Sequence, residues 1–384
     1  MPDGIAIERL RRADIDEIAP LWKALLDHIA ALPDAVVPVR PSDESWGLER
    51  RAMLAALEGD AFALVARRDG VAVGYVFVLI EGPDPVWYTG DAHAELAHLS
   101  VAPGERGAGV GTALMDAMDA ELERRGVEDV EIGVDTGNDV AARLYESRGY
   151  RPDFRIFYGS PGKKPWACLR REAADRRAGR GRFAPPAASG ADEGRETAPG
   201  AADPPGAADP PSAADPPVIE LLPAADLDRL EPLWRVMQDD QVRRWNVLPA
   251  RDPAGSWALR RQRYADWLAT TDSFVLVARR GERLIGYFMV AVAEGDETFD
   301  TGERLAELES LVVLPEERGA RLGEQFFQTG MRRLEELGVE HVVCGLLVTN
   351  PFIRRFCERH GFVPFVDFMY ARRTDIQANA KEDR

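Results

Sequence analysis

The sequence has few cysteines and no long apolar run, and both absences narrow the class of protein. Three cysteines among 384 residues, Cys168, Cys344 and Cys357, have no metal-ligand spacing and give no disulfide framework. No run of about twenty apolar residues occurs, so we expect no membrane-spanning helix. The chain enters a strand pattern at Ile5–Ile7 without an apolar signal segment. These features predict a protein of the reducing cytoplasm.

The sequence is also short of positive charge. Its 65 acidic residues outnumber 48 basic ones, which gives a formal net charge of −17. This charge disfavours nucleic acid and anionic membrane surfaces as partners, and it is compatible with a cationic partner such as an amine. At this length we expect two domains rather than one.

A strand, a glycine-rich turn and a helix follow one another in the middle of the first half. Residues 95–101 have the apolar pattern of a strand. Gly107, Gly109 and Gly111 lie within five positions, and a helical pattern begins at Thr112. Several backbone N–H groups and the positive end of a helix dipole therefore surround one point, which suits a phosphate or pyrophosphate.

Three phosphate-binding patterns compete for this loop. A Walker loop ends in Gly-Lys-Ser/Thr, but here Gly111 is followed directly by Thr112. A dinucleotide fingerprint needs G-x-G-x-x-G, and the third glycine comes one residue early. The third pattern, Gln/Arg-x-x-Gly-x-Gly/Ala, is matched by Arg106, Gly109 and Gly111. An ordinary glycine-rich turn is the alternative to all three.

Residues farther along the chain make the third pattern specific. Asn138 opens a helix that contains Leu144-Tyr145-Glu146, and Gly149-Tyr150 closes it. In this order and spacing, the loop, the asparagine and the tyrosine resemble the GNAT superfamily of N-acetyltransferases over about residues 4–158. The resemblance implies an α/β fold with a central, mostly antiparallel, splayed sheet flanked by helices.

The resemblance also implies direct transfer of an acetyl group from acetyl-CoA to a primary amine. Glu95 would be the general base, directly or through a water, and Tyr145 would protonate the departing thiolate. The loop backbone would bind the pyrophosphate, while the preceding strand and Asn138 would hold the pantetheine arm. No step needs a metal. The implied cofactor-binding residues are Leu99, Ser100, Val101, Arg106, Gly107, Ala108, Gly109, Val110, Gly111, Thr112 and Asn138.

His98 competes with Glu95 for the role of base. It lies three positions after Glu95, so the alternation of a regular strand places the two on opposite faces. Each candidate also has a structural interpretation: a buried, hydrogen-bonded His98, an ion-paired Glu95 and a core Tyr145. Acidic residues expected near the acceptor would suit a cationic amine; they are Glu81, Asp84 and Asp91.

The second half of the chain repeats the first. Glu307 lies 212 positions after Glu95, and Asn350 lies 212 positions after Asn138, which indicates a duplicated domain. Between the halves Ala-Ala-Asp-Pro-Pro recurs at positions 201, 207 and 213, a composition that predicts a disordered linker. We therefore expect a GNAT domain at 1–172, the linker at 173–217, a second GNAT-like domain at 218–374 and a flexible tail at 375–384.

The second copy departs from the family pattern at two positions. Arg321 stands where the first copy has Gly109, and Cys357 stands where it has Tyr145. An arginine side chain would hinder close approach of phosphates, although its guanidinium could itself pair with an anion. We therefore predict an active first copy and a degenerate second, as an intramolecular pseudo-dimer or as independent units. The alternatives are a non-catalytic acyl-CoA-binding regulator, a transferase for another acyl-CoA, and an enzyme in which both copies work.

Overall fold

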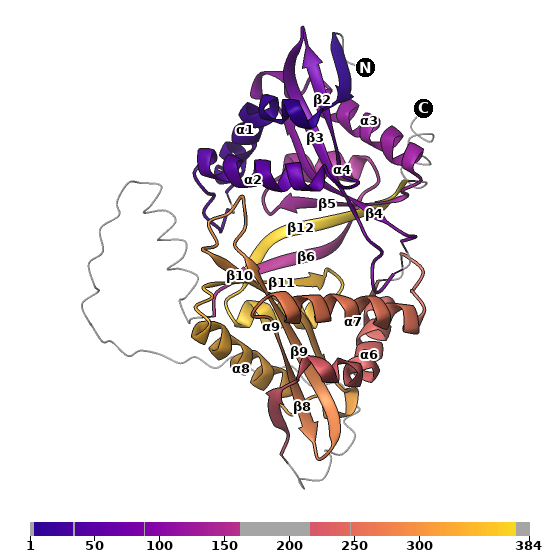
Figure 1. Cartoon of the computed structure of the whole chain (residues 1–384), viewed down its shortest axis with the longest axis vertical. Helices are drawn as coiled ribbons and strands as arrows, with labels where there is room; N and C mark the ends of the chain where they lie inside the picture. The colour runs from indigo at the N-terminus through magenta and orange to yellow at the C-terminus, as the bar shows by residue number, and fades with distance from the viewer. Residues whose placement is uncertain (1–3, 34, 88, 162–215, 246, 374–384) are drawn as a thin grey trace, which may run out of the picture.

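The computed structural model describes residues 4–33, 35–87, 89–161, 216–245 and 247–373. The predicted tail and all but two residues of the predicted linker lie outside these ranges. No helix in the described part of the chain is long and apolar enough to cross a membrane. The two halves share one twelve-stranded sheet with helices on both faces (Figure 1).

The same order of elements occurs in both halves. The first half contains β1 (Ile5–Arg9), α1 (Ala19–Ala30), α2 (Ser42–Ala56), β2 (Phe62–Arg68), β3 (Val71–Glu81), β4 (His93–Val101), α3 (Val110–Arg125), β5 (Asp129–Asp135), α4 (Asp139–Ser147) and β6 (Arg151–Gly159). The second half contains β7 (Val218–Leu221), α6 (Glu231–Arg244), α7 (Pro253–Thr270), β8 (Phe274–Arg280), β9 (Arg283–Glu294), β10 (Arg304–Val313), α8 (Leu322–Glu336), β11 (His341–Leu347), α9 (Pro351–Arg359) and β12 (Val363–Arg372).

Local signals in the sequence account for several element ends. The turn between β2 and β3 uses Asp69 and Gly70, both with positive φ, as a tight hairpin requires. Helix α3 ends at Gly126, whose left-handed backbone lets its N–H bond the last turn. Asn138 caps α4 by accepting a hydrogen bond from the N–H of Ala141 at 3.3 Å.

Helices cover both faces of the sheet in each half. In the first half, α3 buries its apolar stripe against β2–β5, with Met115, Met118 and Leu122 fully buried. Apolar residues of α1 and α2 pack against the other face, around Tyr75 and Phe77 of β3. The second half repeats this arrangement with α8 on one face and α6 and α7 on the other.

The two halves exchange their last strands. The sheet order is β1-β2-β3-β4-β5-β12-β6-β11-β10-β9-β8-β7, so β12 pairs with β5 and β6 pairs with β11. Strands β12 and β6 also pair with each other, and both cross the middle of the molecule in Figure 1. The sheet is therefore continuous through the centre, and each half completes the sheet of the other.

Reciprocal loop contacts add to this exchange. The β3–β4 loop of the first half reaches the α6–α7 connection, where Trp87 and Ala250 form a β-bridge. The β9–β10 loop of the second half reaches the α1–α2 connection, where the Arg40 N–H donates to the Thr298 carbonyl at 2.9 Å. Each half thus borders the open sheet face of the other.

Candidate active site

Strands β4 and β5 separate soon after they begin. They pair in parallel over three positions, Ala94 with Val130, Glu95 with Glu131, and Leu96 with Ile132. Residues 97–101 of β4 pair only with β3, so their backbone polar groups on the β5 side are open to an extended ligand. This segment contains three of the predicted cofactor-binding residues, Leu99, Ser100 and Val101.

The glycine-rich loop follows directly at the end of β4. Gly107 and Gly109 have φ values of 78° and 80°, which L side chains rarely adopt. Helix α3 begins at Val110, so its first free N–H groups face the loop. Arg106, Gly107, Ala108, Gly109 and Thr112 are exposed, and the Arg106 Nε donates to the Val101 carbonyl at 3.3 Å. Loop and helix start together form an anion-binding geometry.

Glu95 sits at the point where the strands separate. Burial, and to a lesser extent the nearby Glu81 charge, raise the pKa of its carboxyl group. Its cross-strand neighbour Glu131 is also largely buried, and its pKa is raised to about 8 by burial and by Asp153, Glu95 and Asp84. A carboxyl with a raised pKa is a stronger base, which suits proton abstraction near neutral pH.

Tyr145 lies in the core on α4, with only 6% of its surface exposed. Burial and the charge of Asp135 raise the pKa of its phenol, which therefore stays protonated. Asn138 uses its side-chain oxygen to cap the helix that carries Tyr145. Ser100 is buried, and its hydroxyl donates to the Leu21 carbonyl at 2.9 Å, so only its backbone faces a ligand.

The prediction that His98 faces away from Glu95 is wrong. A β-bulge shifts the register, so that Phe77 faces His98 and Val78 faces Leu96. The extra residue, Ala97, returns His98 to the face of β4 that carries Glu95. His98 packs 4.7 Å from the Trp22 ring and 5.7 Å from the Phe77 ring, measured between centroids.

His98 is also not the hydrogen-bonded residue that its structural interpretation describes. Its Nδ1 has no partner within the described residues, and its Nε2 lies 3.6 Å from Glu49. Burial lowers the pKa of His98 to about 3 and raises the pKa of Glu49 to about 8. Both side chains are therefore neutral at pH 7, and His98 is a weak base.

The second half repeats the backbone of this site with other side chains. Strands β10 and β11 also pair over three positions, ending at Glu307 and Val343. Arg321 adopts a φ of 58°, the left-handed conformation that Gly109 has in the first half. The Cys357 Sγ lies 3.4 Å from the Cys344 Sγ, and both thiols are buried.

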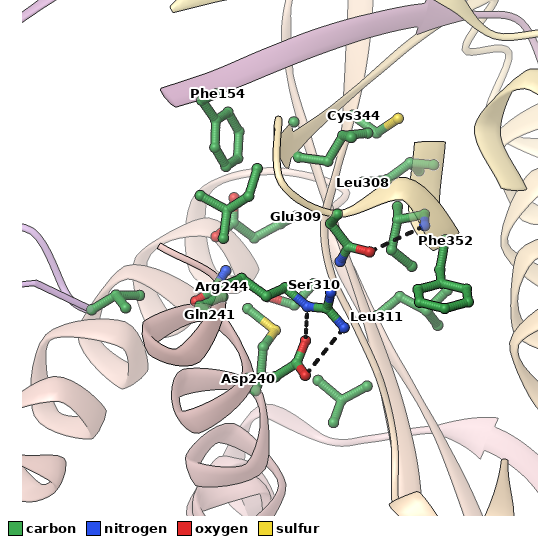
Figure 2. A pocket seen from close by; sticks show the side chains of 18 of the residues that line it. Phe154, Asp240, Gln241, Arg244, Leu308, Glu309, Ser310, Leu311, Cys344 and Phe352 are labelled. Atoms are coloured by element: carbon green, nitrogen blue, oxygen red, sulfur yellow. Dashed lines mark hydrogen bonds and ion pairs between the residues drawn. The ribbon is translucent and has the colours of Figure 1, made fainter. Parts of the chain in front are cut away.

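A cavity of about 1350 Å³ connects the two halves. It is lined by the second loop, including Arg318 and Arg321, and by residues of α6–α9 on both faces of the sheet. Figure 2 shows part of its wall, where Arg244 pairs with Asp240. The cavity also reaches Asp84, Glu131 and Asp153 of the first half.

Glu131 and Asp153 were not identified from the sequence. Glu131 interrupts the otherwise apolar strand Val130–Val134, and a charged residue at a strand position between buried neighbours was the available signal. Asp153 had no such signal, because β6 joins the cavity wall only through the strand exchange. Of the predicted acidic residues, Asp84 lines the cavity.

The fold and its two splayed clefts define an acyltransferase. The acetyltransferase (GNAT) family model matches residues 22–150 and 234–362, more than half of the chain. The chain therefore belongs to the GNAT family, with two tandem copies of its fold.

Known proteins similar to this chain agree with that assignment. A mycothiol acetyltransferase of Thermobispora bispora is 35% identical over 158 residues, covering 39% of this chain and 48% of that protein. The chain thus spans about half the length of the curated relatives it matches. A GCN5-related N-acetyltransferase from Sphaerobacter thermophilus is 15% identical, covers 97% of both chains and has a TM-score of 0.56. A tandem GNAT protein from the clavulanic acid biosynthesis pathway is 18% identical, covers 96% of this chain and 98% of its own, and has a TM-score of 0.51. The two structures support the fold.

Proposed function

We propose that the first half transfers an acetyl group from acetyl-CoA to a primary amine by direct attack of the amine on the thioester. One observation carries this proposal: β4 separates from β5 immediately after Glu95 and then enters a loop with two left-handed glycines at the start of α3. A thioester bound along the open edge of β4 would meet the base at one end and an anion site at the other. The names of the curated relatives support acetyl as the group transferred.

In this proposal the coenzyme is held mainly by backbone groups. The N–H groups of residues 106–112 would bind the pyrophosphate, aided by the dipole of α3. The open edge of β4 at Leu99–Val101 would pair with the pantetheine arm, and Asn138 would contact it farther along. A β4 backbone N–H would stabilise the oxyanion that forms at the thioester carbonyl.

Two side chains would move protons. The amine is protonated at neutral pH and must lose a proton before it can attack, and Glu95 would accept that proton directly or through a water. The nitrogen then forms the C–N bond, the C–S bond breaks, and Tyr145 would donate its phenolic proton to the departing sulfur. Buried Tyr145 is suited to this role because its proton is retained until a stronger base arrives.

A second candidate function is transfer by both halves. It is favoured by the cavity beside Arg318 and Arg321, which is wide enough for a ligand next to the second loop. In that arrangement Glu307 would be the second base. A non-catalytic acyl-CoA regulator needs neither Glu95 nor Tyr145, and a longer acyl group would need more room beside the thioester.

A calorimetric titration with acetyl-CoA tests the proposal by counting sites per chain. We expect one site that Gly109→Arg abolishes, because the new side chain would project into the phosphate path. Two sites in the unaltered chain would favour transfer by both halves. An absence of binding would contradict acetyl transfer by this protein.

A further inference from the structure

The cavity ends in the first half at two buried carboxyl groups, Glu131 on β5 and Asp153 on β6. Asp153 is only 8% exposed, and its Oδ1 has no hydrogen-bond partner in the described part of the chain. A buried carboxylate oxygen without a partner is costly, because it has lost its water without gaining another contact. This oxygen therefore indicates a ligand that the cavity admits.

The charges around these two groups are of one sign. Burial and Asp84 raise the pKa of Asp153 to about 7, while Asp153, Glu95 and Asp84 add to the effect of burial on Glu131. Among the described residues, neither Glu131 nor Asp153 has an ion-pair partner. Like charges held close together without a cation favour the binding of one.

Elsewhere in the cavity the carboxylates are already compensated. Glu309 forms an ion pair with Arg260, and Asp240 forms one with Arg244. Arg263, also in the cavity wall, acts with Arg260 to lower the pKa of Glu307 against the effect of burial. The uncompensated negative charge is therefore confined to the end formed by the first half.

The duplicated fold does not require this acidic end. The counterparts of Glu131 and Asp153, 212 positions later, are Val343 and Phe365. Both belong to an apolar cluster with Val37 and Tyr158. The same places in the fold thus accept apolar side chains, and the carboxylates are a property of the first copy alone.

We infer that Glu131 and Asp153 bind a second ammonium group of the acceptor, so that the acceptor is a diamine or polyamine. This inference rests on the proposed function, in which Glu95 deprotonates the amine that reacts. Glu131 is the direct neighbour of Glu95 across strands about 4.8 Å apart, so a short alkyl chain spans the two positions. Val86, Trp87 and Phe154 line the same cavity and provide apolar contacts for the methylene groups.

The test compares 1,4-diaminobutane with butan-1-amine as acceptors for acetyl-CoA, measured as kcat/KM. We expect the diamine to be preferred by about tenfold to a hundredfold, the range of a charge-assisted contact. The variants Asp153→Asn and Glu131→Gln should lower this preference to a few-fold or less. Asp240→Asn is the matched control, since it removes a carboxylate from the same cavity that Arg244 already neutralises, and it should keep the full preference.

Calorimetry of both amines without acetyl-CoA separates this inference from the proposed function. If neither amine is acetylated, the proposed function fails, and a calorimetric preference for the diamine that Asp153→Asn removes still supports the acidic site. Equal binding of the two amines by the unaltered protein overturns the inference. A preference that survives the combined Asp153→Asn and Glu131→Gln variant also overturns it.

Discussion

In the first half, glycine occupies the left-handed position before α3, whereas in the second half Arg321 occupies the same position with a φ of 58°. Both loops precede a helix of similar length, and both follow a strand that separates from its parallel neighbour after three residue pairs. The backbone of the cleft is therefore common to the two halves, and the side chains differ.

This comparison shows which parts of the cleft depend on the fold and which on the residues. Strand separation and helix start recur because they follow from the sheet and the helix packing on it. The buried phenol of Tyr145 is replaced by the Cys357 thiol, and Glu131 is replaced by Val343. Differences in chemistry between the halves should therefore follow these substitutions, and paired variants at equivalent positions can test this.

The largest difference should come from the two strand glutamates. Glu95→Gln should lower kcat about a thousandfold, because the amide cannot accept a proton from the amine. Glu307→Gln, the same change in the second half, should leave kcat within a few-fold of the unaltered chain. Steady-state kinetics with acetyl-CoA and an amine acceptor measure both. Equal losses in the two variants would show that both halves catalyse the reaction.

A smaller difference is expected at the acid. Tyr145→Phe should lower kcat about a hundredfold, while the affinity for acetyl-CoA, measured by calorimetry, should stay unchanged. Cys357→Ser should have little effect on kcat. A Tyr145→Phe variant with full activity would leave Tyr145 as a core tyrosine, and loss of coenzyme binding would point to a structural role.

The pair Glu49 and Arg261 should differ in the pH dependence of stability. The pKa of Glu49 is about 8 in the folded protein and about 4.3 in the unfolded chain, so the folded state holds a proton that the unfolded state has lost between these values. The stabilisation is complete below about pH 4.3 and disappears as pH rises towards 8. This group should lower the free energy of unfolding by about 1.4 kcal/mol per pH unit in that window.

Denaturant titrations between pH 5 and pH 8 measure this slope. Glu49→Gln should reduce the slope by the contribution of this one group. Arg261→Gln is the control at the equivalent position, where Arg261 forms an exposed ion pair with Asp228. An unchanged slope in Glu49→Gln would mean that Glu49 is ionised in the folded protein.

The smallest effect concerns the backbone of the second loop. Arg321→Gly should raise the free energy of unfolding by about 1 kcal/mol, because glycine adopts a positive φ without steric cost. Gly109→Ala should lower it by a similar amount in the first loop. Thermal unfolding of both variants measures these changes. Destabilisation by Arg321→Gly would show that the arginine side chain makes contacts worth more than the strain.

The sequence was sufficient for the motifs but not for the faces of β4. The loop, the capping Asn138 and the helix end at Gly126 were predicted from local patterns, since each depends on residues a few positions apart. The position of His98 was missed because a bulge inserts Ala97, and bulges depend on the partner strand. The predicted roles of Glu95 and Tyr145, and the domain boundaries at 172 and 218, remain predictions.

By itself the sequence determined that the chain contains two related units, because the 212-residue offset and the spacing of the motifs can be read along the chain. Only the tertiary structure decided which sheet each last strand joins. Strands β6 and β12 are equivalent, so exchanged and unexchanged pairings offer similar hydrogen bonds, and no local pattern distinguishes them. That choice brings Asp153 to the cavity wall near Glu131, and residues brought together by strand pairing cannot be located from sequence spacing alone.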